Sequence, residues 1–513
     1  MSVAIVRSPL ADIPLPPLQS FFNYYLPSKP RYPDYTAFID GVTGRNITVA
    51  QLRRDSLRLG LGIQDLLKLS LSPQTVAVIY SPNSIDFVQI FYGCQSTKVI
   101  TSLANASYTA TELAHQLRDG EPSIAFVHPS IYDAYLGAIK LLETEGRSAP
   151  KLFWAVPENE VPRELMRNTP DAKSYQALLM DEATVQNFQG TPAKGEEAHE
   201  TALLCYSSGT TGLAKGVMST HHNLNVNGEI SAKSCYPENL AYGKGSMILN
   251  ACPMYHLYGL MEAVIIPLLT GVPVVNLPKF TPEGFFRAIQ NYKANAAFVV
   301  PPMVLHLANN PLAANYDLSS LKWMRSAAAP LGQGLIRKVK SKLGDDVHIT
   351  QGYGLTEVTC LCTAQTVADA LSNPGSVGRL YPCLQAKIVD EHLMPAKVGE
   401  PGELCIKGPT VMNIVDRLKE LIKYKGFQVP PADLEKLLLT NPKVGDVAVI
   451  GVHSREFATE LPRAYVVPAG GLDKLSAKER EELALELVSW VEKNVCLPQA
   501  PPEDVPEVAK SLG

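Results

Sequence analysis

The sequence predicts an α/β protein in which a large domain built on parallel sheets is followed by a small α+β domain. Strand-like and helix-like segments alternate through roughly the first four hundred residues, a pattern typical of parallel sheets that carry helices on both faces. The length of 513 residues exceeds that of one ordinary domain. Near residue 415 the alternation gives way to a densely charged run, 416–426, which marks the boundary.

Charge and composition exclude several classes of protein. Lys and Arg number 46 against 50 Asp and Glu, with no basic stripe, so nucleic acid is not an expected partner. The longest apolar stretch, 263–269, is too short to span a bilayer, and the proline-rich residues 1–18 lack the apolar core of a secretory signal. The nine cysteines show no metal-site spacing, so we expect reduced, mostly buried thiols and a cytosolic protein.

The first predicted elements lie between residues 75 and 128. Residues 75–80 are apolar and β-branched, as in a buried strand. The turn that follows ends with Ser84, which we expect to cap a helix that begins at Ile85. Residues 124–128 form another strand, so the chain begins with strand, helix and strand units.

A further helix and strand are predicted between residues 281 and 300. Thr281 caps the helix, Pro282 occupies its first position and Glu283 adds an early acidic side chain. Its buried face is expected to contain Phe285, Phe286, Ile289 and Tyr292. The strand 296–300 follows and ends at a pair of prolines.

The small domain is predicted from strands at 446–452 and 463–467 and a helix from about Ala477. Apolar residues recur at helical spacing in that helix, which indicates a core face rather than a site: Leu483, Leu487, Val488, Val491 and Val495. After Cys496 the pattern stops, and 497–513 is predicted to be a disordered tail.

The segment 206–217 carries the strongest functional signal. It follows a buried strand at 202–205, and its glycines and hydroxyl side chains surround a single lysine, Lys215. Glycine lets the backbone approach an anion closely, so we expect this loop to bind polyphosphate. The spacing is not that of the P-loop, which argues against the common kinase and hydrolase folds. A flexible surface linker is the alternative interpretation.

Three further segments fit a nucleotide site. Residues 351–357 follow a predicted strand at 347–350 and place Tyr353, Thr356 and Glu357 on one predicted turn, where they suit stacking on a base, a phosphate contact and Mg²⁺. Residues 326–331 are small enough to admit a flat base. Residues 253–259 set His256 among aromatic side chains, although a lone histidine in such a place is usually a core residue.

Together these segments resemble the ordered motifs of the acyl-adenylating superfamily, and most closely its 4-coumarate CoA ligase-like group, which includes fungal acyl-CoA ligases. The resemblance runs from about Phe38 to Val495. It implies a large domain over 1–413 with two doubly wound sheets and an incomplete small β-barrel. A small α+β domain over 414–496 would follow, with a hinge near 416–419. It also implies ATP, Mg²⁺ and CoA as cofactors or co-substrates.

The resemblance also implies roles for individual residues. The predicted phosphate-loop contacts are Tyr206, Ser207, Ser208, Gly209, Thr210, Thr211, Gly212 and Lys215. The predicted adenine and α-phosphate contacts are Ala328, Gln351, Gly352, Tyr353, Gly354 and Thr356. The predicted acyl pocket comprises His256, Tyr258, Glu262, Val300, Met303 and Gly352. Glu357 would bind magnesium, and Lys215, His256, Thr356 and Glu357 would be catalytic.

Further roles fall on the charged run and on one earlier lysine. Arg417 would bind ribose, Lys419 would lie at the hinge, and Lys423 and Gln428 would contact the adenylate. Lys279, Lys425 and Gly426 would contact CoA. A solvated surface is the alternative interpretation of each lysine in 419–425.

The chain departs from this family in four places. Ala214 replaces a usual proline and Ala327 a usual glycine, and both changes are tolerable. After Asn413 several dozen residues with a Thr/Ser-Gly-Asp motif are missing. After Val495 a Pro-x-x-x-Gly-Lys segment is missing, and the tail offers only Lys510. The missing aspartate would bind ribose and the missing lysine would catalyse adenylation.

We therefore expect an ATP-dependent acyl-CoA ligase of fungal-type specialised metabolism, acting on a medium-sized aliphatic or aromatic carboxylic acid, and impaired by the missing motifs. The competing hypothesis is an inactive remnant that still binds nucleotide, and a luciferase-like oxygenase is a more distant one. The chain ends in Ser-Leu-Gly rather than Ser-Lys-Leu, so the cytoplasm is the expected location and the peroxisome the alternative.

Overall fold

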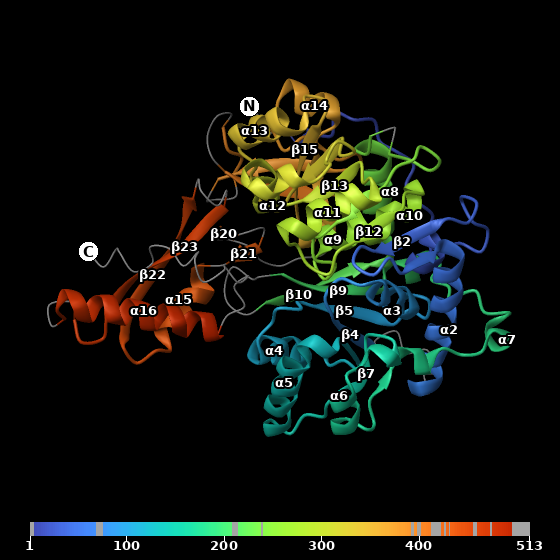
Figure 1. The fold of residues 1–513 in the computed structure, drawn as a ribbon, viewed down its shortest axis with the longest axis horizontal. Helices are drawn as coiled ribbons and strands as arrows, with labels where there is room; N and C mark the ends of the chain where they lie inside the picture. Colours follow the sequence, from blue (N-terminus) through green and yellow to red (C-terminus); the bar gives the residue numbers. More distant parts are fainter. Residues whose placement is uncertain are drawn as a thin grey trace.

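The computed structural model describes residues 5–67, 75–207, 214–237, 240–390, 394–397, 402–411, 422–424, 427–429, 431–454, 459–471 and 475–494. Two large sheets and their helices form the main body, and a smaller group of strands and helices lies to one side, on the left in Figure 1. A hydrophobic core runs continuously between the two large sheets.

The first large sheet has seven strands in the order β10-β9-β5-β4-β6-β7-β8. All neighbouring strands are parallel except β9 and β10, which form a hairpin. The strands are β4 (Val76–Tyr80), β5 (Ile100–Ala104), β6 (Ile124–Val127), β7 (Lys151–Trp154), β8 (Lys173–Ser174), β9 (Thr201–Ser207) and β10 (Lys215–Thr220). Because parallel sheets bind ligands beyond the carboxyl ends of their strands, this edge is the place for a site.

The second large sheet has nine strands in the order β17-β16-β15-β14-β13-β11-β12-β2-β3. Its six central strands are parallel, while β3, β16 and β17 are antiparallel additions at its two edges. The strands are β2 (Thr36–Asp40), β3 (Asn46–Thr48), β11 (Ile248–Asn250), β12 (Val274–Asn276), β13 (Ala296–Val299), β14 (Trp323–Ser326), β15 (His348–Leu355), β16 (Cys360–Ala364) and β17 (Arg379–Leu380).

Helices cover both sheets. In Figure 1 the group α4–α6 lies below the first sheet, and α11–α13 lie on the second. The helices of this part are α1 (Phe21–Tyr25), α2 (Val49–Leu67), α3 (Ile85–Gln95), α4 (Ala110–Gly120), α5 (Tyr132–Thr144), α6 (Arg163–Asn168), α7 (Glu182–Val185), α8 (His221–Ser234), α9 (Leu257–Leu260), α10 (Ile266–Thr270), α11 (Pro282–Tyr292), α12 (Pro301–Asn309), α13 (Gln333–Leu343) and α14 (Val367–Ser372).

A third sheet of three strands, in the order β1-β18-β19, stands where the sequence predicts an incomplete small barrel. Its strands are β1 (Val6–Arg7), β18 (Gln385–Val389) and β19 (Glu403–Lys407). The side group contains β20 (Ile422–Tyr424), β21 (Phe427–Val429), α15 (Pro431–Leu439), β22 (Val444–Ser454), β23 (Thr459–Pro468) and α16 (Ala477–Asn494). The predicted fold class, a large α/β domain followed by a small α+β domain, is confirmed.

Local sequence signals explain several element boundaries. Ser84 caps α3 by accepting a hydrogen bond from the backbone N–H of Phe87, and Thr281 caps α11 in the same way. In α16 the predicted core residues Leu483 and Leu487 are buried against α15 and β22. Val495 lies outside the described residues.

One predicted boundary is confirmed and one is wrong. The predicted strand 296–300 is β13, which ends at Val299 before the two prolines, and these prolines begin α12, because proline suits the first turn of a helix, where its missing N–H is not needed. The glycine-rich residues 351–355 form no turn but continue β15, and they pair antiparallel with β16. The turn comes later, in a single 3₁₀ turn at Thr356–Val358.

Candidate active site

The predicted phosphate loop connects β9 and β10. Ser208, Gly209, Thr210, Thr211 and Gly212 lie outside the described residues, but both ends of the loop are described. Ser207, the last residue of β9, pairs with Lys215, the first residue of β10. The hairpin therefore brings the predicted phosphate-binding lysine opposite a serine at the carboxyl edge of the first sheet.

Both ends of the loop are fastened to α4. The Tyr206 hydroxyl donates a hydrogen bond to Asp119 over 2.6 Å, and burial together with this bond raises the pKa of Tyr206. Nε2 of His115 lies 2.7 Å from the carbonyl oxygen of Ala214. That contact uses the backbone carbonyl, which alanine and proline both possess, so alanine at this position keeps it.

Glu357 lies in the 3₁₀ turn after β15 and connects the second sheet to the first. The Ser207 hydroxyl donates a hydrogen bond to Oε1 of Glu357 over 3.3 Å, and both residues are buried. The two residues that follow the turn, Thr359 and Cys360, have φ angles of +58° and +101°. Such left-handed backbone is costly outside glycine, and it is commonly kept where a side chain must be aimed.

The turn is held from two further directions. Asn227 in α8 donates hydrogen bonds to the carbonyl oxygens of Val358 and Leu361, over 3.4 and 2.9 Å. The Thr359 hydroxyl donates to the carbonyl oxygen of Thr410 over 2.8 Å. The position of the Glu357 carboxylate is thus fixed by contacts on both sides of its turn.

The segment that contains His256 runs beside β9. The Cys205 thiol donates to the carbonyl oxygen of Tyr255 over 3.6 Å, and burial raises the pKa of that thiol to about 12, so it stays protonated. The His256 side chain is half-buried, and desolvation lowers its pKa to about 4. A neutral imidazole therefore lies near the strand that carries Ser207.

The predicted acyl-pocket residues are distributed over three neighbouring elements. Tyr258 in α9 donates a hydrogen bond to the carbonyl oxygen of Arg325 over 2.7 Å, and its ring packs edge to face on Phe298. Val300 caps α12 and is half-buried, while Met303 in the first turn of that helix is buried. The structure thus brings Tyr258 to the carboxyl end of β14 and places Val300 and Met303 at the carboxyl end of β13.

Glu262 has a different environment from the one predicted. It lies in a π-helical turn, Met261–Ile265, and is 1% exposed. Both of its carboxylate oxygens lie 3.2 Å from Nη1 of Arg325, and the Tyr236 hydroxyl donates to it over 2.8 Å. The carboxylate is therefore engaged inside the protein, which favours a supporting role behind the site over direct contact with a substrate.

Arg325 completes this buried cluster. Its guanidinium donates to the carbonyl oxygen of Cys235 over 2.6 Å and lies over the rings of Tyr236 and Trp323, 5.0 Å from each centroid. Burial acts to lower the pKa of Arg325, but the Glu262 carboxylate and nearby buried groups raise it overall. Arg325 lies in β14, directly before the segment 326–331, and its charged side chain is paired with Glu262 of the π-helical turn.

The predicted adenine-binding residues meet at the ends of β14 and β15. Ala328 has φ of +70°, and Gln351 holds the segment by accepting a hydrogen bond from the backbone N–H of Leu331 over 3.0 Å. The Gln351 amide also donates to the carbonyl oxygen of Pro374 over 2.9 Å, so its side chain is used internally. Gly354 lies so close to β16 that a Cβ would stand 1.8 Å from the carbonyl oxygen of Cys360.

Comparison with known proteins identifies the family. The model of the AMP-binding enzyme family matches residues 28–414, and that of the AMP-binding enzyme C-terminal domain matches 433–512. This chain belongs to the AMP-binding enzyme family. The match at 433–512 includes residues predicted above to form a disordered tail, which lie outside the described residues.

Curated relatives of this AMP-binding enzyme are similar over most of their length. It is 32% identical to the probable 4-coumarate–CoA ligase 1 of Dictyostelium discoideum, over 95% of this chain and 91% of the relative. It is 34% identical to a probable CoA ligase of Humulus lupulus, over 85% of this chain and 81% of the relative. The first alignment has 526 positions, more than the 513 residues present here, so parts of that relative face gaps in this chain.

Solved structures share the fold of this AMP-binding enzyme. A long-chain-fatty-acid–CoA ligase from Archaeoglobus fulgidus is 21% identical, with a TM-score of 0.70 over 96% of this chain and 98% of that one. The amide bond synthetase McbA from Marinactinospora thermotolerans is 20% identical, with a TM-score of 0.72 over 94% of this chain and 97% of that one. At these identities the likeness concerns the fold.

The remaining predicted contacts are only partly described. Lys279 is exposed beyond the end of β12. Arg417, Lys419, Lys425 and Gly426 lie outside the described residues of this AMP-binding enzyme. The backbones of Lys423 and Gln428 face each other across the β20–β21 pair. Within the described ranges every helix is too short or too polar to cross a membrane.

Sequence reasoning missed several residues that hold this site. Arg325 is an isolated charge in a buried strand, and Glu262 lies in an apolar run. Because buried charges are usually paired, these two opposite charges could have predicted an ion pair between them. Asp119 and Asn227 carried no such signal, because each acts through a contact that is distant in the sequence.

Proposed function

We propose that this AMP-binding enzyme is an ATP-dependent acyl-CoA ligase that joins a carboxylic acid to CoA through an acyl-adenylate. The observation that carries the proposal is the contact between Ser207 and Glu357, which joins the phosphate-loop strand of one sheet to the acidic turn of the other. Curated relatives named as CoA ligases support the same assignment.

The chemistry matches the groups at this junction. A substrate carboxylate attacks the α-phosphorus of ATP, a bond to the bridging oxygen breaks, and pyrophosphate leaves with its electrons. The thiol of CoA then attacks the acyl carbon, AMP leaves, and the thiol proton is released. Negative charge develops on phosphate oxygens in the first step, so Lys215 and the loop N–H groups would stabilise it there.

The residues present fit a magnesium ion that arrives with ATP. Among the described residues no three His, Cys, Asp or Glu side chains form a metal cage, but the Glu357 carboxylate and the Ser207 hydroxyl offer hard oxygen atoms side by side. Magnesium bound with a nucleotide usually takes one or two carboxylates and completes its shell with phosphate and water. When bound, it would neutralise phosphate charge.

The other site residues take their proposed roles from the resemblance to the acyl-adenylating family. Thr356 would contact the α-phosphate, while Ala328, Gly352 and Tyr353 would enclose adenine and the start of the acyl group. His256, Tyr258, Val300 and Met303 would line the acyl pocket. Lys279, Lys425 and Gly426 would meet CoA, and Arg417, Lys423 and Gln428 the adenylate. A hinge near 416–419 would let the small domain serve both half-reactions.

Calorimetry with ATP, with and without Mg²⁺, tests the nucleotide site directly. Lys215→Ala and Glu357→Ala should each weaken Mg·ATP binding by about 1.5–3 kcal/mol, the usual cost of a lost charge-assisted contact. Lys194→Ala removes an exposed lysine of the large domain and serves as the control. Unchanged affinity in both site variants would refute the assignment.

The reaction itself is tested by ATP–pyrophosphate exchange and by acyl-CoA formation across a panel of aliphatic and aromatic carboxylic acids. Exchange that depends on one group of acids, followed by thioester formation with CoA, is the expected result. Exchange without thioester formation would contradict the assignment to a CoA ligase and leave an adenylating enzyme.

A second candidate is an inactive descendant that still binds nucleotide. It is favoured by the relatives' longer sequences and by the absence of the family's Thr/Ser-Gly-Asp segment after Asn413. Pyrophosphate exchange should be compared between this chain and one in which the missing segments are restored from the gene. Activity only in the restored form would favour this candidate, whereas brisk exchange by the 513-residue chain would exclude it.

The cellular setting is also proposed. A role in fungal-type specialised metabolism is proposed from the resemblance of the motifs to ligases of that group, and the cytoplasm is the proposed location, with the peroxisome as the alternative. A fluorescent protein fused to the N-terminus should remain in the cytosol. Its collection in peroxisomes would establish the alternative location.

A further inference from the structure

Asn83 lies in the turn between β4 and α3, at the carboxyl edge of the first sheet, and is buried with 4% of its surface exposed. Its side-chain amide makes three hydrogen bonds to the loops that follow β11 and β12 of the second sheet. Nδ2 donates to the carbonyl oxygens of Cys252 and Leu277 over 2.9 and 3.1 Å, and Oδ1 accepts from the N–H of Met254 over 2.8 Å. One side chain thus satisfies backbone groups of two different loops.

The two loops carry residues of the proposed site. Met254 precedes His256 by two residues, and Leu277 precedes Lys279 by two residues. The same loops are joined by Asn250, the last residue of β11, which bonds both to Cys252 and to Asn276 at the end of β12. Because the loops leave adjacent parallel strands, a shift in either would move the site residues relative to β9.

From these contacts we infer that Asn83 is a positioning residue, which sets the His256 segment and the Lys279 segment in register with the phosphate-loop sheet. The inference rests on the proposed function for the roles of His256 and Lys279. The physical reason is that three directional bonds from one buried side chain restrain both loops, and removing the amide takes away its bonds to Leu277 and Met254 as well as one of the two bonds to the Cys252 carbonyl.

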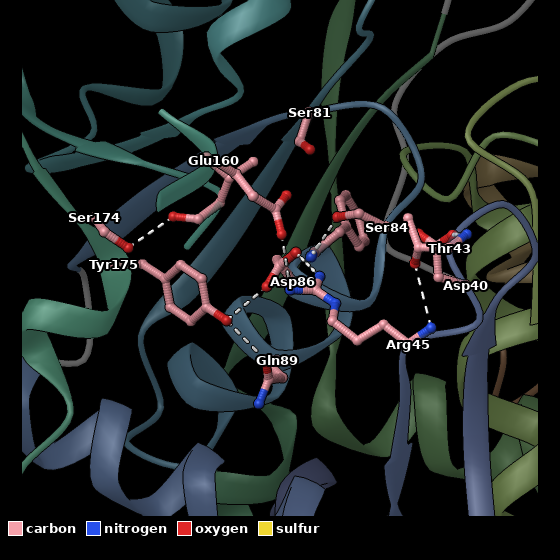
Figure 2. A network of polar contacts seen from close by, with 12 residues as sticks. Asp40, Thr43, Arg45, Ser81, Ser84, Asp86, Gln89, Glu160, Ser174 and Tyr175 are labelled. Carbon is pink, nitrogen blue, oxygen red and sulfur yellow. Dashed lines mark hydrogen bonds and ion pairs between the residues drawn. The ribbon is translucent and has the colours of Figure 1, made fainter. Parts of the chain in front are cut away.

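A second contact between the two sheets lies close to Asn83 and provides a comparison. Arg45, directly before β3, forms an ion pair with Asp86 in the first turn of α3 and a longer one with Glu160, 3.4 Å away. The Tyr175 hydroxyl lies 2.7 Å from both Asp86 and Gln89 (Figure 2). This network joins the same two sheets but touches neither the His256 loop nor the Lys279 loop, so it supports stability without positioning them.

Hydrogen exchange measured by mass spectrometry on the full chain tests the inference without requiring activity. Asn83→Ala should speed amide exchange at least about tenfold in peptides covering 250–260 and 276–281, because the bonds that restrain them are lost. The control is Gln95→Ala, which removes a buried amide at the other end of α3 with two bonds, to Thr101 and to the carbonyl oxygen of Ala202. It should affect exchange near those partners instead.

Kinetics on the active enzyme provide a second readout. Asn83→Ala should lower kcat for thioester formation by between about tenfold and 10²-fold and raise the KM for CoA, the size of effect that a small misplacement produces. Gln95→Ala and Arg45→Met should change the unfolding temperature more than they change kcat. In a double-mutant cycle the variant with both Asn83→Ala and Lys279→Ala should lose less transition-state stabilisation than the sum of the losses in the two single variants.

The outcomes separate the inference from the proposed function. A wild-type chain that forms no acyl-CoA would refute the proposed function, and the amide hydrogen exchange experiment would still decide the role of Asn83. Equal rates of amide hydrogen exchange for residues 250–260 and 276–281 in Asn83→Ala and Gln95→Ala would overturn the inference. If Asn83→Ala does not fold, Asn83→Ser, which keeps one donor, should show an intermediate increase in exchange, and no increase would overturn it.

Discussion

Replacing Glu262 by leucine would remove the carboxylate that faces Arg325, while the arginine stays 0% exposed. The change abolishes two contacts of 3.2 Å to the guanidinium and the bond of 2.8 Å from Tyr236. Arg325 keeps its bond to Cys235 and its two aromatic neighbours, but no described carboxylate replaces the lost charge. Breaking a buried pair from one side usually costs about 3–5 kcal/mol, and we expect Glu262→Leu to cost that much.

The double variant distinguishes the cost of an unpaired charge from the worth of the pair. When both ions are replaced by apolar residues of similar volume, the desolvation penalty of both disappears, and such replacements are often neutral or stabilising. Glu262→Leu with Arg325→Met should therefore recover most of the stability lost in the single variant. Glu262→Gln, which keeps an acceptor for Tyr236, should fall between the single variant and the wild type.

Urea unfolding followed by near-ultraviolet circular dichroism is a suitable assay, because Trp323 and Tyr236 border the pair and report on its surroundings. A decrease of less than about 1 kcal/mol in the free energy of unfolding of Glu262→Leu would refute the reasoning, since burying a charge without a partner costs more than that. So would a double variant less stable than the single one, which would show that the pair contributes net stability.

Three other predictions follow from the backbone and from buried histidine. Gly354→Ala should destabilise the β15–β16 pair by about 1–3 kcal/mol, because the new Cβ would stand 1.8 Å from the Cys360 carbonyl oxygen. Gly352→Ala should cost less, because its nearest neighbours, the Leu361 side chain and the Thr363 carbonyl oxygen, are 3.1 and 3.2 Å away, and thermal unfolding of the two variants compares them. Ala328→Gly should stabilise by up to about 1 kcal/mol, since φ of +70° costs alanine energy that glycine avoids, and no gain would show that the turn adjusts freely. Nδ1 of His221 accepts a hydrogen bond from the N–H of Phe21, and burial lowers the pKa of His221 to about 3. Below a pH of about 6.5 the unfolded chain therefore binds a proton that the folded chain does not, and the free energy of unfolding falls by up to about 1.4 kcal/mol per pH unit. His221→Asn should flatten this pH dependence when unfolding is measured from pH 7 to 4.

Sequence reasoning succeeded where the cause of a structure is local. The cap at Ser84 and the proline-led start of α11 depend on residues within one turn, and both were predicted. The phosphate loop is predicted in the same way, because glycine, hydroxyl and lysine side chains stand together in one stretch, and its binding role stays a prediction. The same local view misplaced residues 351–355, where glycine serves a close approach to β16 rather than a turn.

The residues that hold the site together were not predictable in this way. Asn83 reaches partners 169 to 194 residues away, and asparagine in a turn has an ordinary explanation that asks for no distant partner. Glu262 was assigned to the acyl pocket by resemblance, but its surroundings are set by Arg325, which lies 63 residues away in the sequence. Contacts between the two sheets depend on how the sheets pack against each other. No single stretch of the sequence contains that information.

This distribution of contacts bears on what the missing segments can affect. The phosphate-loop strand, the Glu357 turn and the His256 segment are joined by Ser207, Cys205 and Asn83, all of which lie in the described large domain. None of these contacts involves residues after Thr410 or the small domain, so we expect the proposed ATP-binding half of the site to form without the segment that the resemblance implies after Asn413. ATP binding that depends on Lys215 and Glu357 is therefore expected even if pyrophosphate exchange is slow. Binding without exchange would place the defect in the ribose contact or in the small domain, whereas loss of binding would mean that the large domain itself needs the missing strands.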